Sequence, residues 1–214
     1  ALIINDNKIS DIIPVNKLTK NISTYDCHNR YIMPGLIDTH CDSIENQIVP
    51  RKGIIFDFVS ALVQFDKQLL GNGITTMYHS ISVANSTIVN KRRTLSVKEQ
   101  LKIGETIQSI KNNLLITHKF HARLEMNTIE AVDSILSLIE NGCIDELSFM
   151  DHTPGQGQYR DYSMFKLEID KQYGKLDDKE KNKIINQCIS KKKISWEQLL
   201  WLFDICKQFK IRLA

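Results

Sequence analysis

The chain has 214 residues, of which 42% are hydrophobic and 25% are charged, and its formal net charge is +3 at pH 7. This composition is that of a globular protein with enough apolar material for a core, and the length predicts one domain, or one domain and a piece of another. So small a charge argues against a nucleic-acid binder or a membrane-surface protein, and no apolar run is long enough to span a bilayer.

The cysteines indicate the redox compartment. There are five of them, an odd number, and they are scattered without C-x-x-C spacing. This pattern favours reduced thiols over a disulfide framework or a structural zinc site. No signal peptide opens the sequence, and we therefore expect a cytoplasmic protein.

The first segment, residues 1–30, predicts a small strand-rich domain. Leu2 to Ile13 has the pattern of two strands joined by a tight turn at Asn5, Asp6 and Asn7. We expect the remaining residues, 31–214, to form the main domain.

The stretch from Tyr31 to Asp42 carries the first cluster of polar side chains. A short run, Leu36-Ile37, is expected to be buried, after which Asp38, His40 and Asp42 alternate along a strand and share one face. Burying carboxylates and an imidazole together is costly unless a divalent metal ion compensates them. The alternative is a strand that runs out into a polar loop, because an H-x-D triplet alone is common.

Two helices and a strand follow. A stripe of Phe58, Leu62, Phe65 and Leu69 predicts a helix, and Ile103, Ile107 and Ile110 predict another. Between them, residues 74–78 form a β-branched, apolar strand. His79 is expected at the end of that strand, either lining a site or as a structural histidine.

The strand expected at residues 114–126 carries the strongest local signal. His121, Arg123 and Glu125 alternate on one face, and Ala122 and Leu124 alternate on the other. A buried strand with imidazole, cation and acid on one face indicates a ligand site, unless an internal Arg123–Glu125 ion pair explains it.

The rest of the chain continues the alternation of helices and strands. Asn127 and Glu130 predict a capping box before a helix at residues 129–139, and a strand at residues 147–150 leads to His152 in a Gly/Pro loop. Residues 160–193 are lysine-rich, with weak helical periodicity. The last elements are a helix capped by Ser195 and Gln198 and a strand at residues 210–214. The side chains expected to face inward on that helix are Trp196, Leu199, Phe203 and Cys206.

A repeated order of strand then helix predicts an α/β fold with parallel strands and right-handed crossovers. The polar residues fall at the carboxyl ends of the strands, as in a (β/α)8 barrel, and about five of the eight strands of such a barrel are expected.

Several motifs together resemble a known family. Pro-Gly-Leu-Ile-Asp-x-His at residues 34–40 and Gly-Ile-Thr-Thr at residues 73–76 resemble the first two barrel strands of the amidohydrolase superfamily. Within it, the H-x-D, Pro50-Arg51, H-x-R-x-E and Met-Asp-His-Thr-Pro-Gly-Gln-x-Gln motifs resemble the ribose 1-methylphosphonate 5-triphosphate diphosphatases, the PhnM family of the carbon–phosphorus lyase pathway. Ser43 departs from the Asn that this family commonly has after H-x-D.

The resemblance implies a partial TIM-like (β/α)8 metal-dependent hydrolase barrel, preceded by strands of a small β-sandwich domain and carrying a helical insertion at about residues 156–193. Family members continue with a Ser-His-Asp metal-binding segment and a late Asp, the usual general base. We therefore expect the chain to be a fragment or the product of a broken gene. As a complete polypeptide, an open half-barrel with exposed edge strands should be poorly soluble.

The resemblance also implies the chemistry. One or two divalent ions (Zn, Mn or Fe) would be held by His40, Asp42, Glu125 and His152. The reaction would be hydrolysis of a phosphorylated ribose phosphonate, α-D-ribose 1-methylphosphonate 5-triphosphate, to the 5-phosphate and pyrophosphate. No nucleic acid or membrane partner is expected, and a homo-oligomer is compatible with this function. The expected substrate-binding residues are Arg51, Arg123, Gln156, Gln158 and Arg160.

Two alternatives stay open. The first is another amidohydrolase reaction at a C–N bond, for which the same ligands would serve, although the Pro-Gly-Gln-x-Gln string argues against it. The second is a non-catalytic protein, either a truncated remnant or a binding subunit of the carbon–phosphorus lyase assembly. The expected ligands that are missing from the sequence favour this alternative, whereas the retained H-x-D, H-x-R-x-E and Asp-His motifs argue against it.

Overall fold

The computed structural model describes residues 1–6, 8–19, 22–51, 53–85 and 95–214. These residues divide into two compact units, Ala1–Pro34 and Gly35–Ala214. Each unit is described by itself below.

The first unit contains a small antiparallel sheet. Strand β1 (Leu2–Asn5) pairs with β2 (Lys8–Ile12), and a 3-10 helix, η1 (Val15–Lys17), follows. Asp6 in the connecting turn has a φ of 48°, a conformation that Asp tolerates better than most residues. The strand–turn–strand prediction is confirmed for the described residues.

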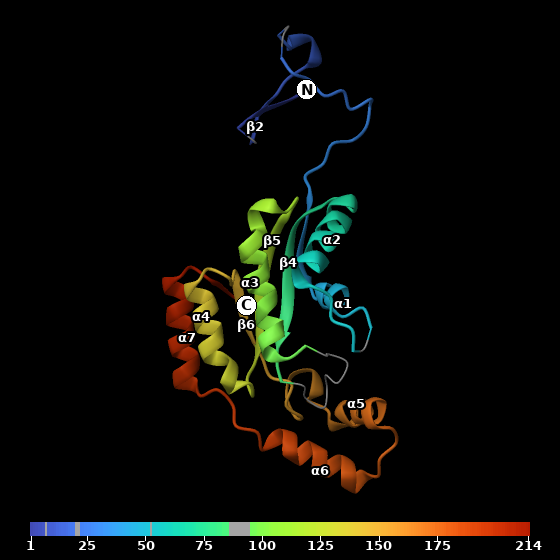
Figure 1. Ribbon diagram of the computed structural model, residues 1–214, viewed down its shortest axis with the longest axis vertical. Coiled ribbons are helices and arrows are strands. Elements are labelled where there is room, and N and C mark those ends of the chain that lie inside the picture. Colours follow the sequence, from blue (N-terminus) through green and yellow to red (C-terminus); the bar gives the residue numbers. More distant parts are fainter. Residues whose placement is uncertain (7, 20–21, 52, 86–94) are drawn as a thin grey trace. The chain divides into compact units, whose positions relative to one another are not determined.

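The second unit is built on a five-stranded half-barrel sheet of order β3-β4-β5-β6-β7, in which every pairing is parallel (Figure 1). The predicted parallel α/β arrangement is therefore confirmed for this unit. The strands are β3 (Leu36–Cys41), β4 (Ile74–Val83), β5 (Thr117–Glu125), β6 (Glu146–Met150) and β7 (Arg212–Leu213).

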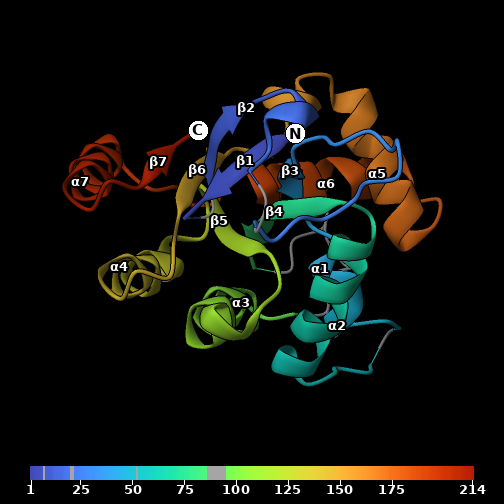
Figure 2. The ribbon, with the colours of Figure 1, turned by 90° about the horizontal axis from the view of Figure 1, so that it is seen from above.

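Helices cover one face of this sheet. Figure 2 shows α2, α3, α4 and α7 in a row outside β4 to β7. The helical segments on this side are α1 (Ile44–Ile48), α2 (Phe58–Gly71), α3 (Val97–Ile110), η3 (Lys111–Asn113), η4 (Ile129–Ala131), α4 (Val132–Glu140) and α7 (Trp196–Gln208). The predicted stripe of α2 is buried against the sheet in the main hydrophobic core. Burial of such a stripe supplies most of the stability of a helix of this length.

Strand alternation gives the sheet a second, polar face. On β4, Met77, Ile81 and Val83 belong to the core, and on β5 the core residues include Phe120 and Leu124. Because successive side chains point to opposite faces, the residues between them lie on the side away from the helices. We call this side the polar face; it comprises His40, Tyr78, Ser80, Ser82, Lys119, His121, Arg123, Glu125, Glu146 and Ser148.

Two strand predictions need correction. Leu36 and Ile37, expected to be buried, are 48% and 64% exposed, because β3 lies at the edge of the sheet and has a neighbour on one side only. His79 was expected at the end of its strand. It lies inside the strand instead, because β4 continues to Val83, and its side chain is fully buried on the helical side.

Two helix predictions are also wrong. The Asn127–Glu130 capping box does not form: Thr128 precedes η4, and the Glu130 carboxylate accepts a hydrogen bond from the amide of Asn85 instead. On α7, Trp196 is 75% exposed instead of facing inward, whereas Leu199 and Cys206 are buried and Phe203 packs against the core as predicted. Leu202, which was not predicted, is buried as well. The Ser195 capping box itself is present.

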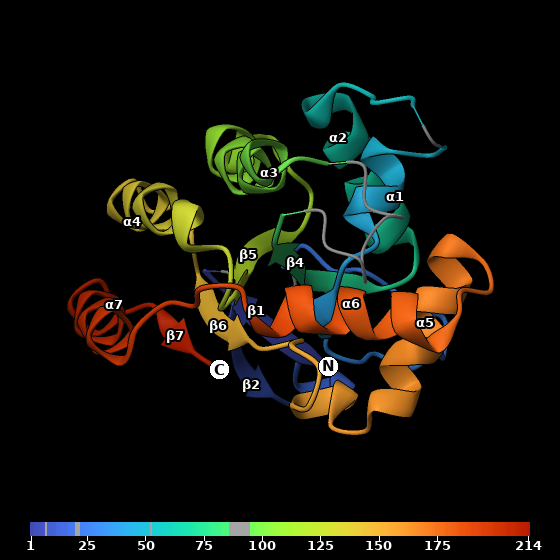
Figure 3. The ribbon, with the colours of Figure 1, turned by 90° about the horizontal axis from the view of Figure 1, so that it is seen from below.

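The insertion after β6 forms a helical hairpin. It consists of η5 (Gly157–Tyr159), α5 (Tyr162–Tyr173) and α6 (Asp178–Ile189), and Figures 1 and 3 show α5 and α6 beyond the carboxyl ends of β4 and β6. The hairpin has a small hydrophobic core of its own, made by Tyr159, Phe165, Ile169, Ile185 and Cys188. This core explains why a segment with weak periodicity is helical.

The five cysteines are free thiols, as expected. Among the described residues, no helix combines the length and the apolar character that a membrane span needs.

Candidate functional site

The centre of the candidate site is a contact between Glu125 and His152. Glu125 is the last residue of β5 and is 4% exposed, and its partner in the parallel ladder is Met150 at the end of β6. His152 follows two residues later and brings its Nδ1 against Oε1 of Glu125. Glu125 and His152, which were expected to bind the same metal centre, are therefore in contact at the ends of neighbouring strands.

The loop that carries His152 is fixed by its neighbour Asp151. The Asp151 carboxylate accepts hydrogen bonds from Lys193 Nζ at 2.7 Å and from the Thr153 amide at 3.1 Å. Burial alone would raise the pKa of Asp151, but these hydrogen bonds hold it below its ordinary value. Asp151 is thus a charged anchor beside His152, and it connects the loop to the residue that follows the helical hairpin.

Aromatic and glycine residues complete this loop. The ring of Tyr159 lies 6.2 Å from that of His152 in an edge-on arrangement. Gly157 has a φ of +49°, and a Cβ there would lie 3.3 Å from the carbonyl oxygen of Asp151. A side chain at position 157 would be both strained and crowded, so the turn requires glycine.

His121, which the sequence placed on the same candidate ligand face as Arg123 and Glu125, lies in a second polar cluster. Its Nδ1 lies 3.1 Å from Ser80 Oγ and its Nε2 lies 2.8 Å from Ser148 Oγ. Burial, with smaller contributions from His40 and Arg123, lowers the pKa of His121 to about 4, so the ring is neutral near pH 7. Strand alternation could identify the face of His121, but its serine partners come from other strands.

His40 lies in this second cluster and not at the Glu125–His152 pair. Its ring centroid is 5.9 Å from that of His121, at an interplanar angle of 86°. The register explains the separation, because Cys41 pairs with His79, and His79 pairs with Phe120. The end of β3 is therefore level with Phe120 in the middle of β5, five residues before Glu125, or about 17 Å along a strand. Asp42 follows β3 and is exposed.

The expected substrate-binding residues lie on three segments. Arg123 is on the polar face, with Nη1 3.5 Å from the carbonyl oxygen of Ser80. Arg51 lies between α1 and α2, where it forms an isolated bridge with Ile54. Gln156, Gln158 and Arg160 are exposed around η5. Among the described residues, neither Arg51 nor Arg160 makes a hydrogen bond or ion pair with Glu125 or His152.

The expected ligands provide only part of a binding site for a divalent ion. Imidazole nitrogen and carboxylate oxygen are standard ligands of Zn, Mn and Fe, and Glu125 and His152 are close enough to serve as two of them. Within the described ranges, however, no three side chains of His, Cys, Asp and Glu converge in a ligand group. The structure thus brings together two of the four expected ligands.

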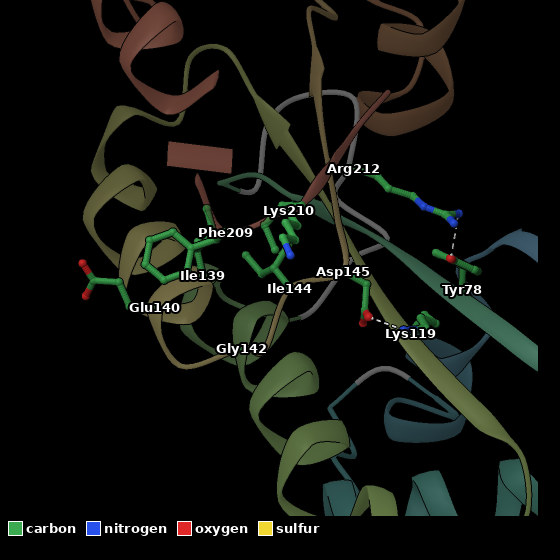
Figure 4. Close-up of a pocket in the computed structure, with 11 residues that line it drawn as sticks. Tyr78, Lys119, Ile139, Glu140, Gly142, Ile144, Asp145, Phe209, Lys210 and Arg212 are labelled. Carbon is green, nitrogen blue, oxygen red and sulfur yellow. Dashed lines mark hydrogen bonds and ion pairs between the residues drawn. The ribbon is translucent and has the colours of Figure 1, made fainter. Parts of the chain in front are cut away.

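Two cavities of the second unit lie away from this site. One of about 390 Å³ lies near the amino ends of β5, β6 and β7 (Figure 4). There Lys119 Nζ is 2.6 Å from Asp145 Oδ1, and Arg212 donates to the Tyr78 hydroxyl at 3.1 Å. Another, of about 490 Å³, lies beside the end of α3. Neither cavity is lined by an expected site residue.

A parallel sheet with helices along one face, and with polar side chains meeting beyond its carboxyl edge, is typical of α/β enzymes. No family model matches the chain. Over 145 residues, or 65% of its length, the chain is 26% identical to the alpha-D-ribose 1-methylphosphonate 5-triphosphate diphosphatase of Escherichia coli (strain K12). The matched part makes up 38% of that protein. The similarity supports a distant relation to that diphosphatase, which is a hydrolase.

Proposed function

We propose that this chain is part of a metal-dependent hydrolase of the amidohydrolase superfamily. Its substrate would be α-D-ribose 1-methylphosphonate 5-triphosphate, and its products the 5-phosphate and pyrophosphate. The observation that carries the proposal is the contact of Glu125 with His152, because it joins the H-x-R-x-E strand to the Met150–Gln158 segment. The distant similarity to the diphosphatase supports the same reaction. A cytoplasmic enzyme would suit the free thiols.

His40, Asp42, Glu125 and His152 would hold one or two divalent ions. A bound divalent ion lowers the pKa of water, so that hydroxide is available near neutral pH, and offsets the charge of phosphate oxygens. Glu125 would supply an anionic ligand from a buried strand end, and His152 a neutral one from the adjoining loop. The Asp151–Lys193 contact would keep the His152 loop in place.

The arginines would bind the triphosphate. Guanidinium groups match the geometry of phosphate oxygens, and the position of Arg123 on the polar face, two residues before Glu125, supports such a role for it. Arg51 and Arg160 are exposed on loops. They would contact the triphosphate of a long anionic substrate if these loops moved toward it. Gln156 and Gln158 would orient substrate oxygens from the same loop as His152.

The test is release of pyrophosphate from the triphosphate substrate by the full-length form of the proposed hydrolase, in the presence of Zn²⁺, Mn²⁺ or Fe²⁺. Glu125→Gln should reduce turnover to background, because it removes a charged ligand and little volume. Glu140→Gln, at the end of α4, is the matched control and should retain full activity. Unchanged turnover in Glu125→Gln would refute the ligand assignment. Cleavage of a cyclic amide, with no pyrophosphate release, would favour the C–N hydrolase alternative.

A further inference from the structure

The cavity of about 390 Å³ near the amino ends of β5, β6 and β7 has the volume of a small-molecule site (Figure 4). Part of its wall is apolar, where Ile139 at the end of α4, Ile144 before β6 and Phe209 after α7 line it. The rest is polar and carries charged side chains from β5, β7 and the turns beside them. None of these residues takes part in the proposed hydrolysis, so that proposal leaves the cavity without a role.

Neither acidic side chain of this cavity is available to neutralise further cations. The two oxygens of Asp145 are engaged: Oδ1 lies 2.6 Å from Lys119 Nζ, and Oδ2 accepts from the Phe120 amide at 2.9 Å. Glu140 is exposed, and Figure 4 shows its carboxylate directed away from Lys119 and Arg212. Asp145 therefore balances Lys119, and the remaining positive charge of the lining is not paired.

Lys210 and Arg212 supply that positive charge. Among the described residues, neither forms an ion pair, and the side-chain hydrogen bond of Arg212 goes to the Tyr78 hydroxyl at 3.1 Å. A guanidinium has five N–H donors, so Arg212 keeps several for a ligand. The Tyr78 oxygen accepts from Arg212, which leaves its own O–H proton to be donated. These side chains therefore present hydrogen-bond donors and positive charge to the cavity.

The backbone of Lys210 shows that a lysine is held here against its conformational preference. Lys210 follows α7 with a φ of +57°, and its amide donates to the Lys207 carbonyl oxygen at 3.2 Å. Helices commonly end in this left-handed conformation, but the residue there is usually glycine, because a Cβ is strained in it. Strained residues persist where the surroundings fix them, and they cluster at functional sites. Lys210 thus keeps an ammonium group at the cavity where glycine would fit the backbone better.

We propose that this cavity binds a small organic phosphate, whose phosphate group accepts hydrogen bonds from Lys210, Arg212 and the Tyr78 hydroxyl. Guanidinium and ammonium groups are common protein ligands of phosphate, and hydrogen bonds between charged groups are the strong ones. The donors reach the cavity from β4, from β7 and from the turn before β7. An anion with oxygens in several directions matches them better than a planar carboxylate does.

The volume and the apolar wall indicate that the ligand has an organic part. One water molecule occupies about 30 Å³, so a phosphate group, with about five heavy atoms, fills less than half of the 390 Å³. The remaining space adjoins the apolar wall. This inference does not depend on the proposed metal centre, because Glu125 and His152 lie at the opposite ends of β5 and β6.

Binding is measured by NMR of the ¹⁵N-labelled chain, titrated with phenyl phosphate at constant ionic strength. The amides of residues 209–213 should shift to saturation, because the ligand lies against them. Arg212→Gln should weaken the affinity about 10–100-fold, the effect of losing a hydrogen bond between charged groups. Lys207→Gln, in the last turn of α7 and outside the cavity lining, is the matched control and should bind as the wild type does.

Lys210→Gly separates loss of binding from loss of folding. Glycine adopts a φ of +57° without strain, so this variant should melt at or above the wild-type temperature. It lacks the ammonium group and should bind phenyl phosphate about 10-fold more weakly. Wild-type affinity in both Lys210→Gly and Arg212→Gln would overturn the inference, and so would the absence of saturable shifts in residues 209–213.

Two further measurements identify the ligand and its place. Inorganic phosphate should bind more weakly than phenyl phosphate, and equal affinity would overturn the assignment of an organic ligand. Arg123→Gln, on the polar face, should leave the affinity for phenyl phosphate unchanged. If Arg123→Gln weakens binding and Arg212→Gln does not, the phosphate binds on the polar face. That result would overturn the cavity inference and support the proposed triphosphate site.

Discussion

The Asp66 carboxylate and the His118 imidazole are joined by a hydrogen bond of 3.0 Å in the interior, between α2 and β5. His118 Nε2 donates this bond, so its Nδ1 accepts from His79 Nε2–H at 2.7 Å. The same carboxylate accepts from the backbone amides of Leu115 and Ile116, at 2.9 and 3.1 Å. Asp66 thus links α2 to the start of β5 and, through His118, to β4. These contacts are on the helical side of the sheet and are structural.

Replacing this carboxylate should destabilise the fold. Asp66→Asn keeps one acceptor oxygen but turns an NH₂ group toward a buried donor. The expected cost is about 2 kcal/mol, within the range of about 1–3 kcal/mol for an unsatisfied buried group, measured by urea unfolding. Asp57→Asn is the matched control on the same helix, because Asn caps a helix as well as Asp does and should accept the Ser60 amide equally. Equal midpoints for the two variants would contradict the assigned role.

Stability should fall with acid because of His79 and His118. Burial lowers the pKa of His79 to about 3, and burial also lowers the pKa of His118 although Asp66 opposes it. Both are neutral in the folded protein and titrate near pH 6.5 when unfolded. Their contribution is fully present above that pH and is lost as pH falls below it, by about 1.4 kcal/mol per pH unit for His79, while His118 contributes a loss of the same sign. The loss from His79 stops near pH 3.

Urea unfolding at pH 7.5, 6.0 and 5.0 measures this dependence. His79→Leu should reduce the slope between pH 6 and 5 by about 1.4 kcal/mol per unit, since one titrating group is removed. His28→Leu removes an exposed histidine and should leave the slope as it is. The assignment fails if both variants keep the wild-type slope.

The contact of Lys193 with Asp151 should control the order of the His152 loop. The two side chains are each 26% exposed, so the pair contributes at most about 1 kcal/mol to global stability. Lys193→Met should instead speed amide hydrogen exchange in residues 153–160. Lys171→Met, which removes an exposed pair with Glu168 within α5, is the control. Equal exchange in the two variants would show that the Lys193 contact does not order the loop.

Two glycines should respond to alanine in opposite directions. A Cβ at Gly104 in α3 would lie 2.7 Å from Cδ1 of Phe120, a fully buried ring, whereas nothing lies within 4 Å of one at Gly71 in α2. Gly104→Ala should therefore destabilise by about 1–3 kcal/mol through overpacking. Gly71→Ala should be neutral or stabilise by up to about 1 kcal/mol through helix propensity. The melting temperatures of the two variants, compared with that of the wild type, test both predictions. A Gly104→Ala variant that melts at a higher temperature would show that α3 does not pack against Phe120 as described.

Much of the secondary structure was predictable because its signals are local. The apolar stripes of α2 and α3 and the alternation on β5 depend on residues that are near in sequence, and all three appear in the structure. The capping boxes show the limit of local signals. Ser195 with Gln198 forms one, whereas Glu130 bonds to Asn85, a residue 45 positions away. A tertiary partner there replaces the local one.

The sequence by itself determined which residues share a face: His121, Arg123 and Glu125 point one way because a strand repeats every two residues. Only the tertiary structure decided which of these faces meet. The register of β3 against β4 and β5 places His40 beside His121, and the register of β5 against β6 places Glu125 beside His152. Strand register depends on pairing between residues far apart in the chain, and no local pattern specifies it.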